Sequence, residues 1–386
     1  MDVYNMKIRA LVCFLFVLGG CADPKSTFAP SESISCRAPE TPRSAWERQS
    51  RASGLAVSTV DKNFKEGLIR YVDLVKGQVW QTPGLGSGDS FVRADEKHFY
   101  VVNRLRQDGV RILDRLTMEA LVDKHDEDLS NPSDVAVVGD KLFLSRYEKK
   151  TLRRYRLPEL VLEKEYDLSP FADGDGIPEA QWMKHSDGRL YIELQRLTRD
   201  PKTPLMLPKD SGAVAVLDIE SDTLQPKAIA LTGGNPVTDL KFDPKGDLFV
   251  GTMGQYAKLD GGIERVTGKP GFVVTEEELG GDIVDFAWTG ETELVAIVRS
   301  LPPVHTRLLR VQLGESRSQT IITERPRDFY EGLHSVLYLE NCNSVVVADR
   351  DTENPRLFFV SLEDFAYVPG RYLSVGLAPY HMVVAP

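Results

Sequence analysis

The sequence predicts an all-β protein, a seven-bladed β-propeller of four-stranded blades whose ring is closed by the C-terminal strand in blade 1. Two observations lead to this prediction. A group of strand-like runs recurs about every 45 residues, which is the spacing of propeller blades. The two ends of the repeat region also have complementary deficits, because the first group lacks a leading run and the last residues supply one.

Each repeat unit begins with a leading run rich in β-branched and aromatic residues, and further runs follow after turn residues. The leading runs start at residues 89, 133, 180, 238, 284, 334 and 380, so neighbouring starts lie 44 to 58 residues apart. The second runs share one frame, as in HFYVVNRL (98–105), KLFLSRYE (141–148) and ELVAIVRS (293–300). This periodicity predicts one four-stranded unit per repeat.

The ends of the repeat region indicate how the ring closes. Residues 54–82 supply three runs without a leading one, and YHMVVAP (380–386) is a leading run that nothing follows. If the last run is the innermost strand of the first blade, two exposed sheet edges disappear. A parallel solenoid, the alternative, would leave both ends needing caps and would not explain the complementary deficits.

Two segments carry a resemblance to a known type of repeat. NPSDVAVVGDKLFLSRYEKKTLRRYRL (131–157) and NPVTDLKFDPKGDLFVGT (235–252) resemble the blades of YVTN-repeat and NHL-like propellers. The resemblance extends over residues 53–386, which we take as the propeller domain. It implies the fold and no single activity, since such propellers include hydrolases, electron carriers and binding scaffolds.

Residues 1–20 are predicted to be a lipoprotein signal peptide. Lys7 and Arg9 precede an apolar run, 10–20, that is too short to span a bilayer and is typical of a signal peptide. LGGC (18–21) resembles the bacterial lipobox, which implies that Cys21 is lipidated and begins the mature chain. The alternative is an ordinary secretory signal. The lipobox predicts a bacterial envelope protein, anchored by lipid (palmitate among its acyl chains) in the outer membrane, on its periplasmic or its surface side.

Residues 21–52 are rich in Pro, Ser and charged residues, so we expect a flexible tether between the lipid and the propeller. Cys36 and Cys342 are the cysteines that remain after the signal peptide and the lipidated residue, and they form an even pair in an oxidising compartment. Cys342 lies in a turn of blade 7, beside the seam where the tether enters. We therefore expect a Cys36–Cys342 disulfide; the alternative is two unpaired thiols.

Alignment of the blades places polar residues at equivalent positions beside the central channel. The candidates for binding a ligand or metal there are Asp134, Asp239, Asp285, His381 and Gln181. Carboxylate oxygens favour Ca²⁺ or Mg²⁺ over zinc, so either ion is a possible cofactor. The alternative is that short polar residues solvate the channel and cap backbone amides.

The second runs end on the same face of the ring and carry a second group of candidates. Arginine and tyrosine are favoured at protein interfaces, and a long insertion (197–210) reaches this face. The candidates for binding a partner are Arg104, Arg146, Tyr147, Arg299, Arg350 and, in the insertion, Met206. The alternative is a solvated rim.

Composition and motifs lead to two functional hypotheses. The net charge is −10 without a basic block, so a nucleic-acid partner is not expected. The first hypothesis is an outer-membrane lipoprotein whose propeller binds another envelope protein, as a scaffold or assembly factor. The alternative is a metal-dependent hydrolase of the lactonase type that uses the acidic channel. The G-x-S-x-G elbow is missing, and we assign no catalytic residue.

Overall fold

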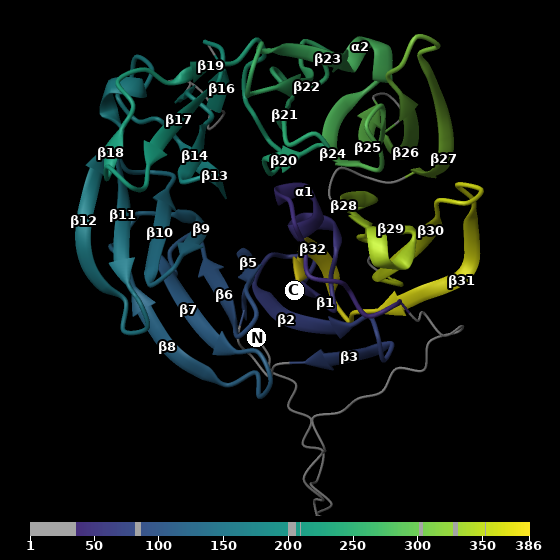
Figure 1. The fold of residues 1–386 in the computed structure, drawn as a ribbon, viewed down its shortest axis with the longest axis horizontal. Helices are drawn as coiled ribbons and strands as arrows, with labels where there is room; N and C mark the ends of the chain where they lie inside the picture. The colour runs from purple at the N-terminus through teal and green to yellow at the C-terminus, as the bar shows by residue number, and fades with distance from the viewer. Residues whose placement is uncertain are drawn as a thin grey trace, which may run out of the picture.

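The computed structural model describes residues 36–81, 86–199, 206–208, 210–300, 304–326, 331–351 and 353–386. The predicted signal peptide and the lipidation site at Cys21 lie outside these residues. Seven antiparallel sheets form a ring around a central channel (Figure 1), which confirms the predicted seven-bladed propeller. None of the helices in the described ranges has the length and apolar content that a membrane span requires.

The first three blades are listed from the innermost strand outward. Blade 1 contains β32 (Ala378–Ala385), β1 (Gly54–Val60), β2 (Glu66–Asp73) and β3 (Gln78–Gln81), with β4 (Gly86–Ser87) on β2. Blade 2 contains β5 (Ser90–Ala94), β6 (His98–Asn103), β7 (Gly109–Asp114) and β8 (Ala120–His125). Blade 3 contains β9 (Pro132–Val138), β10 (Lys141–Arg146), β11 (Thr151–Arg156) and β12 (Val161–Asp167), followed by η1 (Ser169–Phe171).

The other four blades follow the same order. Blade 4 contains β13 (Ala180–Ser186), β14 (Arg189–Leu194), β17 (Ala213–Asp218), β18 (Thr223–Leu224) and β19 (Ile229–Ala230), with a separate hairpin of β15 (Leu197–Arg199) and β16 (Met206–Pro208). Blade 5 contains β20 (Lys241–Phe242), β21 (Leu248–Thr252), β22 (Gly262–Arg265) and β23 (Gly271–Thr275), then α2 (Glu276–Leu279). Blade 6 contains β24 (Asp282–Trp288), β25 (Glu293–Ser300), β26 (His305–Gln312) and β27 (Ser318–Pro326). Blade 7 contains β28 (Leu333–Leu339), β29 (Ser344–Asp349), β30 (Arg356–Ser361) and β31 (Tyr367–Ser374), with η2 (Glu340–Cys342) between its first two strands.

The ring closes as predicted, because β1 pairs with β2 on one side and with the C-terminal strand β32 on the other. The β1–β32 register runs from Gly54 opposite Ala385 to Val60 opposite Ala378. The innermost strands begin at one face of the ring, here called the entrance face, and end at the other, here called the helix face.

The core lies between neighbouring blades because side chains alternate across each strand. In β6, Phe99 and Val101 join a buried cluster with blade 1, whereas Tyr100 and Val102 join a cluster with blade 3. Each sheet is therefore apolar on both faces, and the ring has no single central core. The channel is lined instead by the innermost strands.

The described end of the predicted tether is partly helical, which differs from the flexible chain expected. Helix α1 (Ala45–Ser50) lies over the centre of the ring in Figure 1. Ser44 caps it by accepting a hydrogen bond from the Glu47 amide, 3.1 Å away. Trp46 packs on Tyr338 with ring centroids 5.6 Å apart, and the Gln49 side chain exchanges two hydrogen bonds with the Phe242 backbone. These contacts hold α1 on the helix face.

Cys36 and Cys342 form a disulfide in the structure, with their Cα atoms 4.5 Å apart. The Cys36 amide also donates to the carbonyl of Leu74, and the Arg37 amide donates to the carbonyl of Asn341. The start of the described chain is thereby attached to blades 1 and 7. Both contacts lie on the helix face, beside the seam.

Candidate functional site

Five innermost strands contain a β-bulge near the entrance face, where the register with the next strand shifts. A bulge adds an unpaired residue and redirects its side chain, and bulges are frequent beside active sites. The residues at these irregularities are Ser133, Gln181 with Trp182, Val284, His334 and Tyr380. All of them except Ser133 line one cavity, so the bulges shape this part of the channel.

This cavity, here called the entrance cavity, has a volume of about 220 Å³, and aromatic side chains form part of its walls. The Phe91 ring lies 4.6 Å from that of Trp182 and 5.5 Å from that of Tyr380, between centroids. His334 stacks on Tyr380 and His381 stacks on Trp182, with interplanar angles of 8° and 15°. The rings thus pack against one another, and their π-faces and edges line the cavity.

Three polar side chains of the entrance cavity retain hydrogen-bonding capacity. The guanidinium carbon of Arg104 lies 4.5 Å from the Phe91 ring centroid, and its charge pairs with Asp89 at 3.7 Å. Among the described residues, neither the side-chain amide of Gln181 nor the imidazole of His334 has a hydrogen-bond partner. These are convergent polar groups in an aromatic cavity, which is the usual composition of a small-ligand site.

A layer of ion pairs lies below the entrance cavity. The Arg93 guanidinium donates to both Asp134 oxygens at 2.7 Å and to Asp239 at 2.6 Å. The Lys241 amine donates to Asp285, which also accepts from the Val336 amide at 2.8 Å. The three predicted carboxylates therefore do lie along the channel.

The carboxylates of this layer are neutralised by cations of the chain itself. Arg93 bridges Asp134 and Asp239, so the repulsion that would favour a bound Ca²⁺ or Mg²⁺ is already offset. The described residues contain no group of three or more His, Cys, Asp or Glu side chains placed to hold a metal ion. The geometry therefore gives the predicted metal site no support.

Burial keeps the two histidines of the entrance cavity uncharged. Burial and the nearby Arg93 charge lower the pKa of His381 to about 3. Burial, with Arg350 beside it, lowers the pKa of His334 well below its usual value. The cavity consequently contains two neutral imidazoles next to permanent guanidinium charges.

His381 should make the fold sensitive to acid. Its pKa is about 6.5 in an unfolded chain and about 3 in the fold, so between these values the unfolded state binds more protons and stability falls as the pH falls. We expect the free energy of unfolding to drop about 2–3 kcal/mol more in the natural protein than in His381→Phe between pH 6.5 and 4. Urea titrations at both pH values measure this difference. Parallel stability profiles for the two proteins would contradict the assignment.

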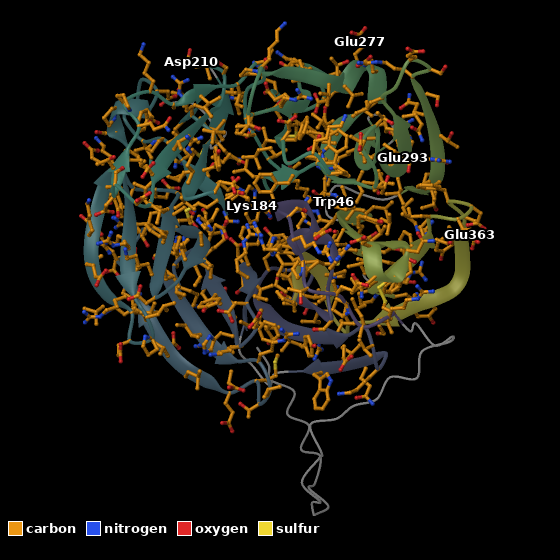
Figure 2. The ribbon with its side chains drawn as sticks, viewed as in Figure 1. Trp46, Lys184, Asp210, Glu277, Glu293 and Glu363 are labelled. Atoms are coloured by element: carbon orange, nitrogen blue, oxygen red, sulfur yellow. A yellow bond between two sulfur atoms is a disulfide. The ribbon has the colours of Figure 1, made fainter. Side chains whose placement is uncertain are left out.

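A second cavity, of about 340 Å³, lies between the ion-pair layer and α1. Trp46 and Lys184, both near the centre of the ring in Figure 2, are among the residues that line it. Burial lowers the pKa of the Lys184 amine. Since α1 covers this end of the channel, the entrance cavity is the part that faces away from the N-terminal segment.

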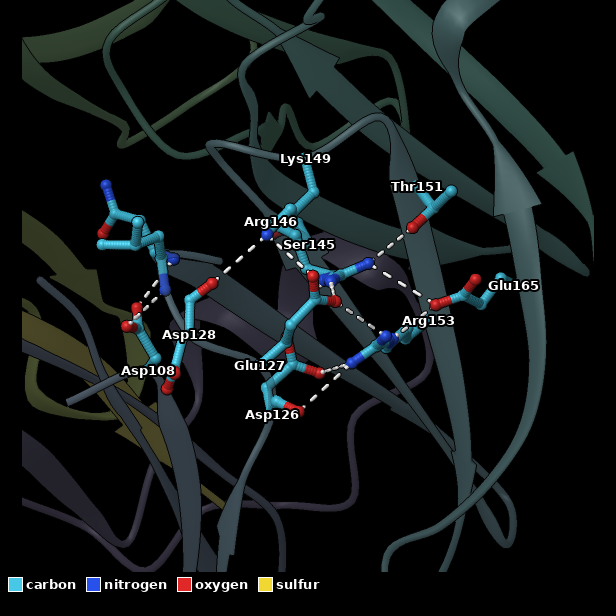
Figure 3. Close-up of polar contacts among 12 residues, drawn as sticks. Asp108, Asp126, Glu127, Asp128, Ser145, Arg146, Lys149, Thr151, Arg153 and Glu165 are labelled. Carbon is cyan, nitrogen blue, oxygen red and sulfur yellow. Dashed lines mark hydrogen bonds and ion pairs between the residues drawn. The ribbon is translucent and has the colours of Figure 1, made fainter. Parts of the chain in front are cut away.

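Arg146 is not a partner-binding residue on the surface, which corrects the sequence prediction. Its side chain is 2% exposed and lies in the charge network of Figure 3. It donates to Asp126 at 3.0 Å and to the Thr151 hydroxyl at 2.6 Å, and it also pairs with Glu127. Neighbouring Arg153 shares these two acids. Arg146 therefore joins strands of blade 3 from within.

The other partner-face candidates are also turned inward or partly covered. Arg350 is 7% exposed, and its guanidinium carbon lies 5.4 Å from the Tyr380 ring centroid. The Tyr147 hydroxyl donates to the Gln195 side chain at 2.7 Å. Burial lowers the pKa of Arg299, and Met206 in β16 is half-buried. The arginines thus line the channel mouth and do not cover the outer face.

The loops of the entrance face expose apolar side chains. Leu105 is 61% exposed and Leu129 is 69% exposed. The exposed large apolar residues of these loops are Phe64, Leu105, Leu129, Leu207, Tyr256 and Leu259. They come from loops of several blades, and Phe64 packs against Tyr380 at the channel mouth with ring centroids 5.8 Å apart. Exposed apolar side chains that gather on one face of a domain mark interaction surfaces.

Comparison with known proteins defines the class of fold and no more. No family model matches the chain, and no curated protein is similar to it in sequence. A putative 6-phosphogluconolactonase from Bacteroides uniformis ATCC 8492 superposes with a TM-score of 0.59 at 14% identity, over 85% of this chain and 98% of its own. A second, from Bacteroides fragilis NCTC 9343, gives 0.54 at 14% identity, over 88% and 99%. The dihydro-heme d1 dehydrogenase NirN in complex with DHE gives 0.53 at 13% identity, over 92% and 81%. These likenesses identify a β-propeller protein.

Proposed function

We propose that this chain is an outer-membrane-anchored lipoprotein of the bacterial envelope whose propeller binds another envelope protein, as a scaffold or assembly factor. The observation that carries the proposal is the group of exposed apolar side chains in the loops of the entrance face. Exposure of such side chains to water is unfavourable. Their burial under a partner would contribute favourable free energy to binding.

The position of the N-terminal segment supports an orientation in which the helix face is near the membrane and the entrance face points away from it. Cys36 is bonded to Cys342, and α1 packs on β20, β28 and β32, all at the helix face. Cys36 comes fifteen positions after Cys21, which allows roughly 50 Å of extended chain at most. A lipid on Cys21 would therefore attach the propeller by its helix face and leave the entrance face turned toward a partner.

Lipidation is tested with Cys21→Ser. The variant should remain an unlipidated precursor or become soluble, because the thiol that receives the acyl chains is gone and the remaining apolar run is too short for stable anchoring. Labelling with radioactive palmitate and fractionation of the membranes measure both properties, with Cys36→Ser as the matched control. Label and membrane association that are retained in Cys21→Ser would refute the anchor.

Partner binding is tested by photo-crosslinking in cells. A photoreactive residue at Leu105, Leu129 or Leu259 should yield the same adduct with one envelope protein. Leu121 on β8 and Ile321 on β27 are matched controls, since they are 54% and 52% exposed but lie on outer strands. Mass spectrometry identifies the adducts. Absence of adducts at the three entrance positions, or identical adducts at the controls, would contradict the proposal.

The lactonase alternative is supported by no contact in the described residues. The two putative 6-phosphogluconolactonases are 14% identical to this chain and share the fold alone with it. We therefore do not advance it.

A further inference from the structure

We propose that the entrance cavity binds a small aromatic carboxylate, a single flat ring that carries one carboxylate group. The ligand would enter from the entrance face and lie with its ring among the aromatic side chains. The cavity lies inside the channel mouth, next to the loops that we propose for the protein partner, and its test uses the purified protein alone.

The walls of the cavity favour a flat ring. Phe91, Trp182 and Tyr380 present π-faces or edges, and offset or edge-to-face contact between aromatic groups is favourable beyond the area that it buries. The stacked His334 and His381 extend these walls and are neutral. A neutral imidazole has one donor and one acceptor; Nδ1 of His381 accepts from the Val92 amide, so His381 can only donate to a ligand.

The polar groups favour a carboxylate on that ring. Arg104 is held over Phe91 and pairs with Asp89 at 3.7 Å, and a guanidinium has five N–H donors, so it can also donate to the carboxylate of a ligand. The side-chain amide of Gln181 and the imidazole of His334 line the same cavity. A ligand with two acceptor oxygens can use donors from all three side chains.

The charges around the cavity also favour an anion over a cation. Asp89 offsets Arg104 at 3.7 Å, but Arg350 adds a second guanidinium over Tyr380. In the ion-pair layer below the cavity, Asp239 is paired with Arg93 and Asp285 is paired with Lys241. The acids of the cavity are thus matched by cations before a ligand arrives.

The volume limits the size of the ligand. At about 220 Å³, the cavity is smaller than the 300–1,000 Å³ typical of sites for drug-sized molecules. It matches one ring with one small substituent. Since the aromatic side chains are already stacked on one another, little side-chain ordering is required on binding.

Benzoate is the probe, with two molecules of similar shape as controls. We expect a dissociation constant below about 1 mM for benzoate by calorimetry. Neutral benzamide should bind at least about 10-fold more weakly, and the planar cation benzamidinium should not bind. In NMR spectra, benzoate should shift the indole N–H signal of Trp182, assigned with Trp182→Phe, and leave that of Trp80 unchanged.

Variants assign the carboxylate contact. Arg104→Gln should weaken benzoate binding by about 10- to 100-fold, and Gln181→Leu by less. Arg317→Gln is the matched control, because Arg317 is 54% exposed and lies outside the cavity. Melting temperatures establish that each variant is folded. Unchanged affinity in folded Arg104→Gln would overturn the carboxylate assignment.

The source of the ligand is tested separately. A peptide that ends in phenylalanine with a free carboxylate, compared with the same peptide amidated, distinguishes a chain terminus from a free acid. Binding of benzoate alone indicates a free small molecule, and binding of both indicates a site open to a partner's C-terminus. Absence of benzoate binding at about 10 mM, or benzamide binding as tightly as benzoate, would overturn the proposal. Neither result would change the crosslinking test of the protein partner.

Discussion

Deletion of residues 378–386 should abolish cooperative folding, because it removes β32, the innermost strand of blade 1. The deletion leaves one edge of β1 unpaired, since only its pairing with β2 remains, and removes Met382, Val383 and Ala385 from two buried clusters. Burial of each larger apolar side chain contributes about 1.5–3 kcal/mol, so the total loss approaches the 5–15 kcal/mol that stabilises a typical domain.

Thermal melting followed by circular dichroism measures this effect. Removal of Pro386 alone is the matched control, since β32 ends at Ala385; it removes only the hydrogen bonds that Pro386 accepts from Ser53 and Arg115, so it should lower the melting temperature far less. A synthetic peptide of residues 377–386 added to the truncated protein should restore a cooperative transition. A truncated protein that melts like the intact one would contradict the closed ring.

Arg93→Met should destabilise the propeller by about 3–5 kcal/mol, because it leaves Asp134 and Asp239 buried without their shared cation. Urea unfolding at neutral pH measures the loss. The difference from the natural protein should narrow toward pH 4, since protonation of an abandoned carboxylate removes the buried charge.

The matched control for this variant is Arg111→Met. Arg111 pairs with Asp123, whose side chain is 57% exposed, so its loss should cost less than about 1 kcal/mol. Equal effects of the two substitutions would show that the ion-pair layer of the channel adds nothing to stability beyond an ordinary surface pair.

The repeat spacing was enough to predict the blades and the closing strand, because every blade repeats the same alternation of buried residues. The carboxylates Asp134, Asp239 and Asp285 were also placed correctly beside the channel. Their cations were missed because the alignment compared one position per blade. Arg93, Lys184 and Lys241 lie two or three residues further along the innermost strands, and comparison of that second position would have found them.

The aromatic walls could not be predicted from alternation. A β-bulge shifts the register, so Trp182, His334 and Tyr380 point where a regular strand would not place them. Arg146 shows a related limit, because a pattern of runs does not reveal that Asp126 and Glu127 of the preceding loop cover it. Helix α1, in contrast, had a signal that was overlooked: Ser44 is followed three residues later by Glu47, a typical helix start.

The attachment of the N-terminal segment to blade 7 has a mechanical consequence. A pull on the chain before Cys36 would reach the propeller first through the covalent bond to Cys342, in η2, and would bypass β1 and α1. The load would therefore enter next to the seam and not through it, so the β1–β32 ladder would not be peeled open from its end. The disulfide would therefore protect the closing strand pair from unfolding under force.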